Sequence, residues 1–427
     1  MTPPRRRRRR RWLLVVLLLI AAAGAAEIAL HLRPGLLPRW YREQFPVKGI
    51  EFVHHDILSR TPIQGYPVPG PQGSYTGPPP AGLVAPTPLV DPTANPDPER
   101  FPRVVLQVDE RGFPNPSRPH HADVIFVGDS FTLAAASLEP PGLQRLLSEA
   151  TGLSIYSLGI PGIGPIRQHW LLRYHGLTLK PRAVVWFFFG GNDLMDASKT
   201  QERIDSGAKT YADNGGYEPT PTVRVLDLAV RAWDRMGAAP PKRERMSEGV
   251  RLAEGPDAGI DSWFSPYYLR LMLTDRPGWK NHPGREIAFQ QLTEVAQMLE
   301  AQDIELLLVY IPTKAEVMLP AVQDQVDRVW QMVTLNMKEE SPITQAEFME
   351  TALRNRGALE GLVQLHCRRE GIRFFTARPL LEQLTEEGRL GYLSADTHWN
   401  NVGQQVLVEP IREILDELGV EPADAGL

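Results

Sequence analysis

The feature that most constrains the fold is an uninterrupted apolar run, Ala183–Phe189, near the middle of the chain. The run is too short for a typical helix, and it lacks the alternation of a strand with one wet face. Strands that are buried on both faces belong mostly to parallel sheets, whose two sides are covered by helices. The run therefore predicts a central strand of a parallel sheet.

Four further runs have the length and apolar character of buried strands. They are Val124–Val127, Ile155–Leu158, Glu305–Ile311 and Ile372–Thr376. Helical patterns separate them; over 288–299, for example, apolar residues recur at helical spacing. Strands that alternate with helices predict an α/β fold, with a parallel sheet of about five strands covered on both faces.

Short polar blocks follow the first three of these strands. Gly128-Asp129-Ser130 ends the first, Gly159–Gly162 follows the second, and Gly190–Asp193 ends the third. The carboxyl ends of parallel strands meet at one edge of the sheet, where open α/β folds hold their sites. We expect the three blocks to lie together at that edge.

The first block and the C-terminal region supply the parts of a nucleophilic site. A serine hydroxyl attacks well only when a base takes its proton. Ser130 is the candidate nucleophile and His398 the candidate base, and Asp396 is the candidate partner that fixes the tautomer of His398. Plainer interpretations stay open, because Asp129 or Ser130 suits a helix cap and Asp396 and His398 suit an exposed pair before another helix.

Acyl transfer also needs hydrogen-bond donors for the oxyanion that forms. Three candidates are the Ser130 backbone N–H, the Gly162 backbone N–H and the Asn192 side-chain amide. An ordinary loop glycine and an ordinary turn asparagine are the alternatives for the last two. Trp399, beside His398, is either a wall of the site or core. The joint presence of all these residues favours a catalytic site.

In this chain order, Ser130, Gly162, Asn192 and His398 resemble the four signature blocks of the SGNH (GDSL-type) hydrolase superfamily. The resemblance implies a three-layer, flavodoxin-like α/β fold. It also implies a serine hydrolase or acyltransferase without a cofactor, in which Asp396 is the acid and Ser130, Gly162 and Asn192 form the oxyanion hole.

Three positions depart from the usual superfamily pattern. Ser157 stands where an asparagine usually lies five residues before Gly162, and Phe131 replaces leucine after the nucleophile. Asp396 lies two residues before His398, where the usual separation is three. The first departure bears on a hydrogen bond that supports the second block, and the last bears on the role of the acid.

Two segments resemble a subgroup, the membrane-anchored alginate O-acetyltransferase-like SGNH proteins. They are Asp396–Trp399, with its short acid-to-base spacing, and Val309–Val317, in which a Pro-Thr-Lys turn follows a strand. The subgroup transfers or removes acetyl groups on exported polysaccharides in bacterial cell envelopes. The resemblance implies an acylated carbohydrate or other ester as substrate, and acyl-donor or polysaccharide-export membrane proteins as partners.

The N-terminus predicts a membrane anchor. The unbroken basic run Arg5–Arg11 precedes a mostly apolar stretch over 12–32, which is the order of a signal peptide or signal anchor. The positive-inside rule keeps the arginines in the cytoplasm. We expect a basic cytoplasmic segment over 1–11, a single-pass transmembrane helix over 12–32 and an extracytoplasmic (periplasmic or extracellular) catalytic domain at a bacterial cell membrane. Small residues over 21–26 leave cleavage open, and a twin-arginine signal also stays open.

Charge and composition limit the partners. The net charge falls from −5 to −12 when the seven positive charges of Arg5–Arg11 are set aside. The exported part is therefore acidic and should not bind nucleic acid by bulk charge. The single cysteine, Cys367, excludes an intrachain disulfide, and a buried, inert thiol is expected in preference to a nucleophile. No Cys/His spacing indicates a zinc site.

The rest of the chain divides into a linker and a catalytic domain. Residues 33–100 are rich in proline and glycine and predict an extended linker. The SGNH-like domain is expected over 101–420, with an added strand over 104–108. A final helix is expected over 402–415, and Pro410 should kink it.

An insertion at about 197–283 interrupts the alternation of strands and helices. It is expected to contain a helix over 223–236 and an aromatic cluster at Trp263–Tyr268. The cluster either packs the insertion onto the core or forms a lid or sugar-binding wall, since aromatic rings combine apolar faces with polar tips.

Two functions remain. The first is a membrane-anchored, extracytoplasmic SGNH serine esterase or O-acyltransferase acting on acyl, above all acetyl, esters of cell-envelope or exported polysaccharide. The second is a non-catalytic glycan-binding or export-complex scaffold on the same fold. A binding module has no need of Ser130, Asp396 and His398 together, which favours the enzyme. Hydrolase and transferase would use the same residues and differ in whether water reaches the acyl-enzyme.

Overall fold

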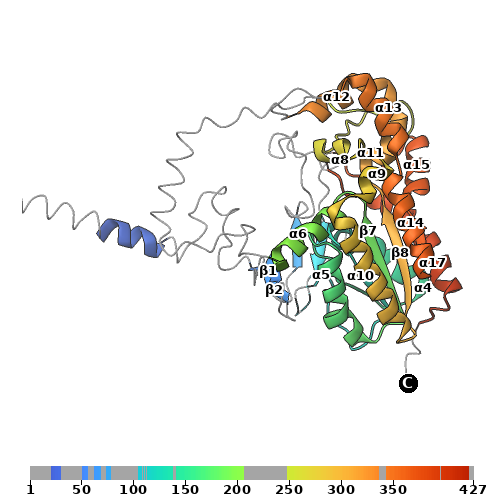
Figure 1. Ribbon diagram of the computed structural model, residues 1–427. Helices are drawn as coiled ribbons and strands as arrows, with labels where there is room; N and C mark the ends of the chain where they lie inside the picture. The colour runs from blue at the N-terminus through green and yellow to red at the C-terminus, as the bar shows by residue number, and fades with distance from the viewer. Residues whose placement is uncertain are drawn as a thin grey trace, which may run out of the picture.

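The computed structural model describes residues 21–29, 51–55, 62–68, 74–77, 104–107, 109, 111, 113–137, 141–205, 248–335, 343–394 and 396–422 (Figure 1). Its centre is a five-stranded sheet with the spatial order β6-β5-β7-β8-β9, in which every neighbouring pair is parallel. The strands are β5 (Val124–Val127), β6 (Ile155–Ser157), β7 (Ala183–Phe189), β8 (Glu305–Ile311) and β9 (Arg373–Thr376). The predicted parallel sheet is confirmed, and only β6 and β9 differ from their predicted bounds, by one residue each.

Helices connect the strands and flank the sheet (Figure 1). In the first half they are α3 (Ser130–Ala135), α4 (Leu143–Thr151), α5 (Pro165–Leu171), η2 (Leu172–Gly176), η3 (Leu177–Leu179) and α6 (Asp193–Asp205). In the second half they are α8 (Pro266–Leu271), α9 (Arg276–Lys280), α10 (Pro283–Glu300), α11 (Lys314–Met318), η5 (Leu319–Gln325), α12 (Val326–Thr334), α13 (Gln345–Asn355), α14 (Ala358–Glu370), α15 (Arg378–Glu386), α16 (Asn401–Gln405) and α17 (Val408–Glu417).

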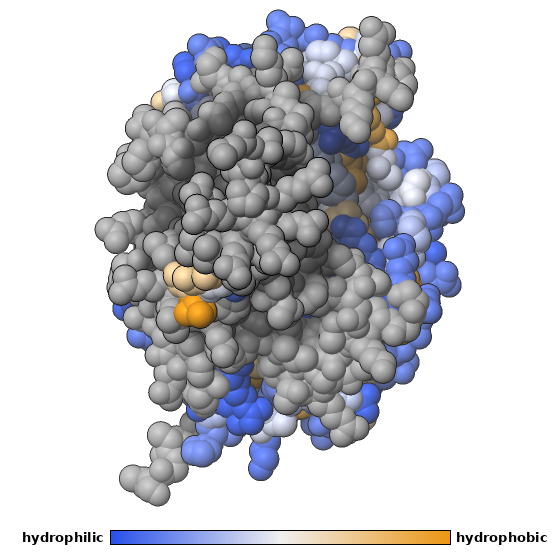
Figure 2. Space-filling view, turned by 90° about the vertical axis from the view of Figure 1, so that its left-hand side faces the viewer, coloured by the Kyte–Doolittle hydropathy of each residue, from blue (hydrophilic) through white to orange (hydrophobic). Residues whose placement is uncertain are grey.

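Alternate side chains of the strands enter two separate apolar layers. Along β7, for example, Val185 and Phe187 point into a layer shared with α4, α12, α15 and α17. Val184 and Trp186 point into the opposite layer, shared with α5, α10 and α14. Each large apolar side chain removed from water contributes about 1.5–3 kcal/mol. The molecule therefore has three layers, with helices on both faces of a parallel sheet. The part of the described surface that Figure 2 shows is mostly hydrophilic.

The order of the strands creates a crevice. The chain forms β5 first, adds β6 on one side, and then crosses to add β7 on the other side of β5. This is the flavodoxin-like order, and ligands bind where the loops diverge at the carboxyl ends of its first and third strands. In this protein those strands are β5 and β7. Ser130 follows β5 after Gly128 and Asp129, and Asn192 follows β7 after two glycines.

The segment expected as an extended linker contains paired strands. β1 (Glu51–His55) pairs antiparallel with β2 (Pro62–Val68), and β3 (Ser74–Gly77) pairs antiparallel with β4 (Val104–Gln107). The added strand expected over 104–108 therefore pairs with β3 and does not join the central sheet. Backbone pairing needs few apolar side chains, so a proline- and glycine-rich composition did not reveal it.

The C-terminal helix differs from its prediction. Two helices, α16 and α17, take the place of one kinked helix, and Pro410 lies in the first turn of α17. A proline is tolerated there because backbone N–H groups in the first turn have no helical acceptor. The helix predicted over 223–236 lies outside the described residues.

Only part of the predicted membrane anchor falls on described residues. Residues 21–29 form a helix, whereas 12–20 and 30–32 lie outside the described part. Among the helices that the structure does describe, none is long and apolar enough to cross a membrane. The transmembrane segment over 12–32 stays a prediction.

Candidate active site

The turn after β5 places Ser130 at the first position of α3. Asp129 is the N-cap, and its Oδ1 accepts a hydrogen bond from the Phe131 N–H at 2.9 Å. Gly128 allows the turn to pass close to the helix, because a Cβ at this position would lie 2.1 Å from Thr132 Oγ1. The capping interpretation thus applies to Asp129, while the Ser130 side chain makes a different contact.

Ser130, His398 and Asp396 form a hydrogen-bonded row. His398 Nε2 lies 2.7 Å from Ser130 Oγ, and His398 Nδ1 lies 2.6 Å from Asp396 Oδ1. All three residues are buried, so Asp396 and His398 are not the exposed pair of the plainer interpretation. A base within reach of a hydroxyl, and itself oriented by a carboxylate, is the arrangement by which a serine is activated.

A closed loop carries both the carboxylate and the imidazole. Tyr392 and Trp399 form an antiparallel bridge at its base, and the Leu393 N–H donates to the His398 carbonyl at 2.9 Å. Within the loop, Asp396 Oδ1 also accepts the backbone N–H of His398 at 2.7 Å. The two-residue spacing therefore lets one carboxylate oxygen hold both the backbone and the ring of His398.

Trp399 belongs to the core. Its ring packs edge-on against Phe131 and Phe187, at centroid distances of 5.5 and 6.0 Å. Its Nε1 donates to the Phe131 carbonyl at 3.2 Å. The indole therefore fastens the loop to the start of α3 and does not form a wall of the site.

The electrostatic surroundings favour a basic imidazole. Burial by itself lowers the pKa of His398, but the charge and hydrogen bond of Asp396, with a smaller contribution from Asp129, outweigh it. The pKa of His398 is therefore raised above its ordinary value of 6.5. A raised pKa makes the ring a stronger acceptor for the Ser130 proton.

The two backbone candidates for oxyanion donors lie at the start of α3 and in the loop after β6. The Ser130 N–H is the first of α3, and the first N–H groups of a helix have no acceptor within it. Gly162 lies in the loop after β6 with φ 67°, in the left-handed region that glycine adopts easily. A Cβ on Gly162 would have no heavy atom within 4 Å, so its peptide borders open space.

Asn192, the third candidate donor, is held by one carboxylate, that of Asp196. Its Nδ2 donates to Asp196 Oδ2 at 3.0 Å, and its carbonyl accepts the Asp196 N–H at 2.8 Å, as an N-cap does. Burial raises the pKa of Asp129 to about 6, against the opposing effects of its hydrogen bond from the Phe131 N–H and of the charge of His398. Burial and the Asp129 charge likewise raise the pKa of Asp196 to about 6.

A row of aromatic rings leads from the imidazole to the surface. Successive centroids are 4.8 Å apart from His398 to Phe131, 4.2 Å to Phe189, 5.5 Å to Tyr268 and 5.3 Å to Tyr267. Tyr267 is 37% exposed, while Trp263 and Phe264 of the same cluster are buried. The cluster at Trp263–Tyr268 is thus divided between core packing and a surface position that leads to the site.

Ser157 retains a hydrogen bond to the second block. Its Oγ accepts the Gly159 N–H at 3.2 Å. Asn115 clamps the same residue, since it accepts from the Ser157 N–H at 2.8 Å and donates to the Ser157 carbonyl at 2.9 Å. The serine at position 157 thus still bonds to the second block through its hydroxyl, and Asn115 fixes its backbone.

Sequence reasoning missed three residues that support the site. They are Asn115, Asp196 and Lys314, of which the last donates to the carbonyls of the loop that carries Asp396. Asn115 has no signal in the sequence. Asp196 lies one helical turn after Asn192, a spacing that suggests contact, and Lys314 ends the Pro-Thr-Lys turn.

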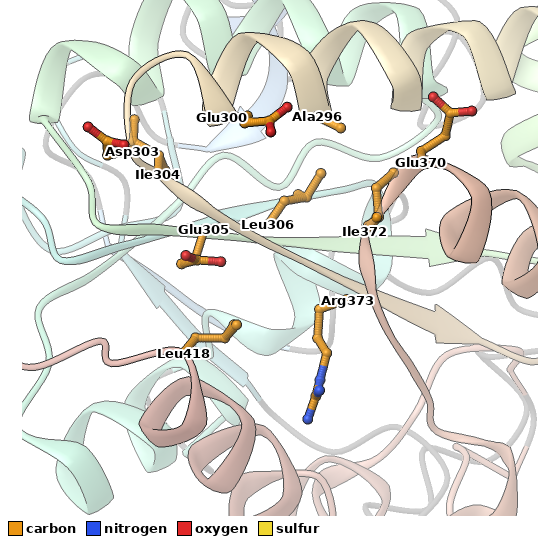
Figure 3. A pocket seen from close by; sticks show the side chains of 11 residues that line it. Ala296, Glu300, Asp303, Ile304, Glu305, Leu306, Glu370, Ile372, Arg373 and Leu418 are labelled. Carbon is orange, nitrogen blue, oxygen red and sulfur yellow. The ribbon is translucent and has the colours of Figure 1, made fainter.

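The other candidates lie away from this site. Burial raises the pKa of Cys367 to about 12, so it is the expected inert thiol. A pocket opens at the amino ends of β8 and β9, the opposite edge of the sheet, lined by Glu300, Asp303, Glu370 and Arg373 among others (Figure 3). No group of three or more His, Cys, Asp or Glu in the described part of the chain is arranged to hold a metal ion.

No protein-family model matches the chain, and no curated protein sequence matches it. Among solved structures, a GDSL-like lipase from Bacteroides thetaiotaomicron matches at 12% identity and a TM-score of 0.32, over 69% of this chain and 87% of that one. An acetyl xylan esterase matches at 14% identity and a TM-score of 0.32, over 68% of this chain and 98% of that one. A lipase/acylhydrolase from Enterococcus faecalis matches at 12% identity and a TM-score of 0.31, over 71% of this chain and 98% of that one. These three proteins to which the chain is similar are a GDSL-like lipase, an acetyl xylan esterase and a lipase/acylhydrolase.

Proposed function

We propose that this protein is a serine esterase or O-acyltransferase of the SGNH type. The observation that carries the proposal is the row Ser130–His398–Asp396, with contacts of 2.7 and 2.6 Å. Ser130 Oγ attacks the acyl carbonyl while His398 Nε2 takes its proton. Asp396 holds the tautomer with a proton on Nδ1 and stabilises the imidazolium that forms. His398 then returns the proton to the departing alcohol and leaves an acyl-enzyme on Ser130.

The negative charge on the carbonyl oxygen is stabilised by the Ser130 N–H, the Gly162 N–H and the Asn192 amide. Such preorganised donors supply a large part of the rate in acyl transfer. Asp196 fixes one hydrogen of the Asn192 amide. The other hydrogen of that amide is the one offered to the substrate oxyanion. Asp196 in this view positions the donor.

Water or a sugar hydroxyl then attacks the acyl-enzyme, again with His398 as the base. We propose acetyl esters of a cell-envelope or exported polysaccharide as the substrates. The Asp-Thr-His-Trp segment and the Pro-Thr-Lys turn support this class, because they resemble the alginate O-acetyltransferase-like proteins. The exposed ring of Tyr267, at the outer end of the aromatic row, offers an apolar face to a sugar ring.

For the location, we propose a bacterial membrane with the catalytic domain outside the cytoplasm. The support is the order of the basic run Arg5–Arg11 and the apolar stretch over 12–32. Alkaline phosphatase, which is active only after export, fused to the C-terminus should be active. An inactive fusion beside an active cytoplasmic reporter would contradict the proposed location.

The catalytic proposal is tested with the full-length chain in detergent. The wild type should release nitrophenol from a nitrophenyl acetate, and a fluorophosphonate should add one adduct to the peptide that holds Ser130. Ser130→Ala should lose both reactions. Ser148→Ala is the matched control, because its hydroxyl bonds to the Leu153 carbonyl in a turn remote from the site. Equal activity of Ser130→Ala and wild type would overturn the assignment. No turnover by a folded wild type, beside glycan binding, would favour the scaffold.

Hydrolase and transferase are separated by partition of the acyl group. An acetylated ester is incubated with increasing concentrations of an unmodified oligosaccharide, and free acetate and acetylated sugar are measured. A hydrolase yields acetate at every concentration of sugar. A transferase yields acetylated sugar at the expense of acetate, because the site keeps water from the acyl-enzyme.

A further inference from the structure

The side chain of Lys314 is buried inside a ring of backbone carbonyls. Its Nζ donates to the carbonyls of Leu393 and Ser394 at 2.8 Å and of Trp263 at 3.0 Å, and the Asp396 carbonyl lies at 3.4 Å. Lys314 is 2% exposed, although lysines are almost never fully buried without partners. An ammonium has three N–H donors, and the three short contacts use all of them.

The ring joins three segments that are distant in sequence. Lys314 itself starts α11, directly after β8, where the Thr313 capping box fixes the start of the helix. Leu393, Ser394 and Asp396 belong to the loop that carries Asp396 and His398. Trp263 comes from the segment before α8, and its N–H donates to the Ser394 carbonyl at 2.9 Å. Lys314 therefore connects the loop to the start of α11, which follows strand β8 of the central sheet.

We propose that Lys314 is a positioning residue whose ammonium holds the 393–396 turn so that Asp396 and His398 meet Ser130. This inference rests on the proposed function. It assigns no contact with substrate to Lys314, which acts only through the loop. Loss of its donors would remove a partner from the Leu393 carbonyl, while the Ser394 carbonyl would keep the Trp263 N–H. In a dry environment the turn would shift to restore the lost hydrogen bonds.

The charge of Lys314 makes this role measurable. Burial lowers the pKa of Lys314 to about 7, and within the described part of the chain the charge of Asp396, on the facing loop, opposes this effect. The other groups in contact with Nζ are the backbone carbonyls of Trp263, Leu393 and Ser394, which carry no net charge. Deprotonation removes one of three donors. The rate should therefore fall on the alkaline side as Lys314 loses its proton, while the acid side follows the protonation of His398.

The experiment compares full-length wild type, Lys314→Met and the exposed control Lys280→Met in detergent. For each, kcat and KM on a nitrophenyl acetate and the rate of fluorophosphonate addition are measured from pH 5 to 10. Methionine keeps length and apolar character but has no donors. We expect wild type and Lys280→Met to show a bell-shaped profile. We expect Lys314→Met to lose about 10²-fold in kcat with little change in KM, as for a small misplacement of reacting groups, and to lack the alkaline limb.

The outcomes separate this inference from the catalytic proposal. If wild type reacts in a Ser130-dependent manner but Lys314→Met keeps both the alkaline limb and kcat within twofold, the positioning role is wrong and the triad stands. If wild type shows no Ser130-dependent reaction, both are overturned. If Lys314→Met does not fold, the wild-type profile decides alone, since a rate that stays constant up to pH 10 excludes a role for the ammonium.

Discussion

Ser130 Oγ and His398 Nε2 lie 2.7 Å apart, although 268 positions separate the two residues in the chain. The contact exists because β5 delivers the serine to the carboxyl edge of the sheet, while the loop after α15 carries the histidine back to the same edge. The site therefore depends on the docking of two structures that the chain forms far apart.

The acid limb of the pH profile should report His398. The base works only when neutral, so kcat/KM should rise with pH through the raised pKa of His398, above 6.5. Asp396→Asn removes the charge that raises this pKa, so the limb should move to lower pH and the maximal rate should fall about 10⁴-fold through loss of the correct tautomer. Asp275→Asn, at the exposed N-cap of α9, is the control for a carboxylate-to-amide change. A limb that stays in place in Asp396→Asn would contradict the role of Asp396.

Asp196 should act through Asn192. Asp196→Asn keeps the size of the side chain but weakens the hold on the Asn192 amide, so kcat should fall about tenfold with little change in KM. Asn192→Ala sets the upper bound, because loss of one oxyanion donor costs about 10²–10³-fold. Asp205→Asn, exposed near the end of the same helix, is the control. Activity of Asp196→Asn equal to wild type, beside a strongly impaired Asn192→Ala, would show that Asn192 needs no support.

Tyr267 should affect sugar esters selectively. Tyr267→Ala removes the exposed ring, so KM for an acetylated oligosaccharide should rise while kcat/KM for a nitrophenyl acetate stays within twofold. Tyr267→Phe keeps the ring and should behave as wild type on both, although it loses the contact of the hydroxyl with Met195 at 3.1 Å. An equal loss on both substrates in Tyr267→Ala would indicate a structural role for the ring.

Gly128 and Gly361 should respond in opposite directions to replacement by alanine. At Gly128 the new Cβ would lie 2.1 Å from Thr132 Oγ1, and overpacking of this kind costs about 1–3 kcal/mol. At Gly361, inside α14, the new Cβ would have no heavy atom within 4 Å, and alanine gains about 0.4–1 kcal/mol over glycine. Denaturant unfolding of each variant measures both effects. A stable, fully active Gly128→Ala would show that the turn after β5 has room to relax.

The sequence predicted the sheet well because its signal is local. Ala183–Phe189 is apolar throughout since both faces of β7 are covered, and that property is visible without any tertiary contact. The pairing of Ser130 with His398 could also be predicted, because residue type and chain order distinguish these two residues. The strands before residue 108 were not, because β1, β2 and β3 pair through their backbones in a segment whose composition predicts a linker.

The supporting residues were beyond prediction for a different reason. Asn115 clamps Ser157 from 42 positions away, and Lys314 bonds to Leu393 from 79 positions away. Each contact joins a side chain to a backbone carbonyl, which every residue possesses, so the sequence does not mark Ser157 or Leu393 as the acceptor. At Pro410 the sequence predicts that the helix is disturbed. The structure shows how, because a new helix, α17, begins just before the proline.

The position of the loop closed by Tyr392 and Trp399 determines when the site can form during synthesis of the chain. The loop holds the carboxylate and the imidazole together, and it is made late, after every strand of the central sheet. A chain that has emerged only as far as β9 contains Ser130 but not yet His398, the proposed base. Under the proposed function, such a chain cannot activate the hydroxyl, so esterase activity would arise only once this loop has been made and has docked.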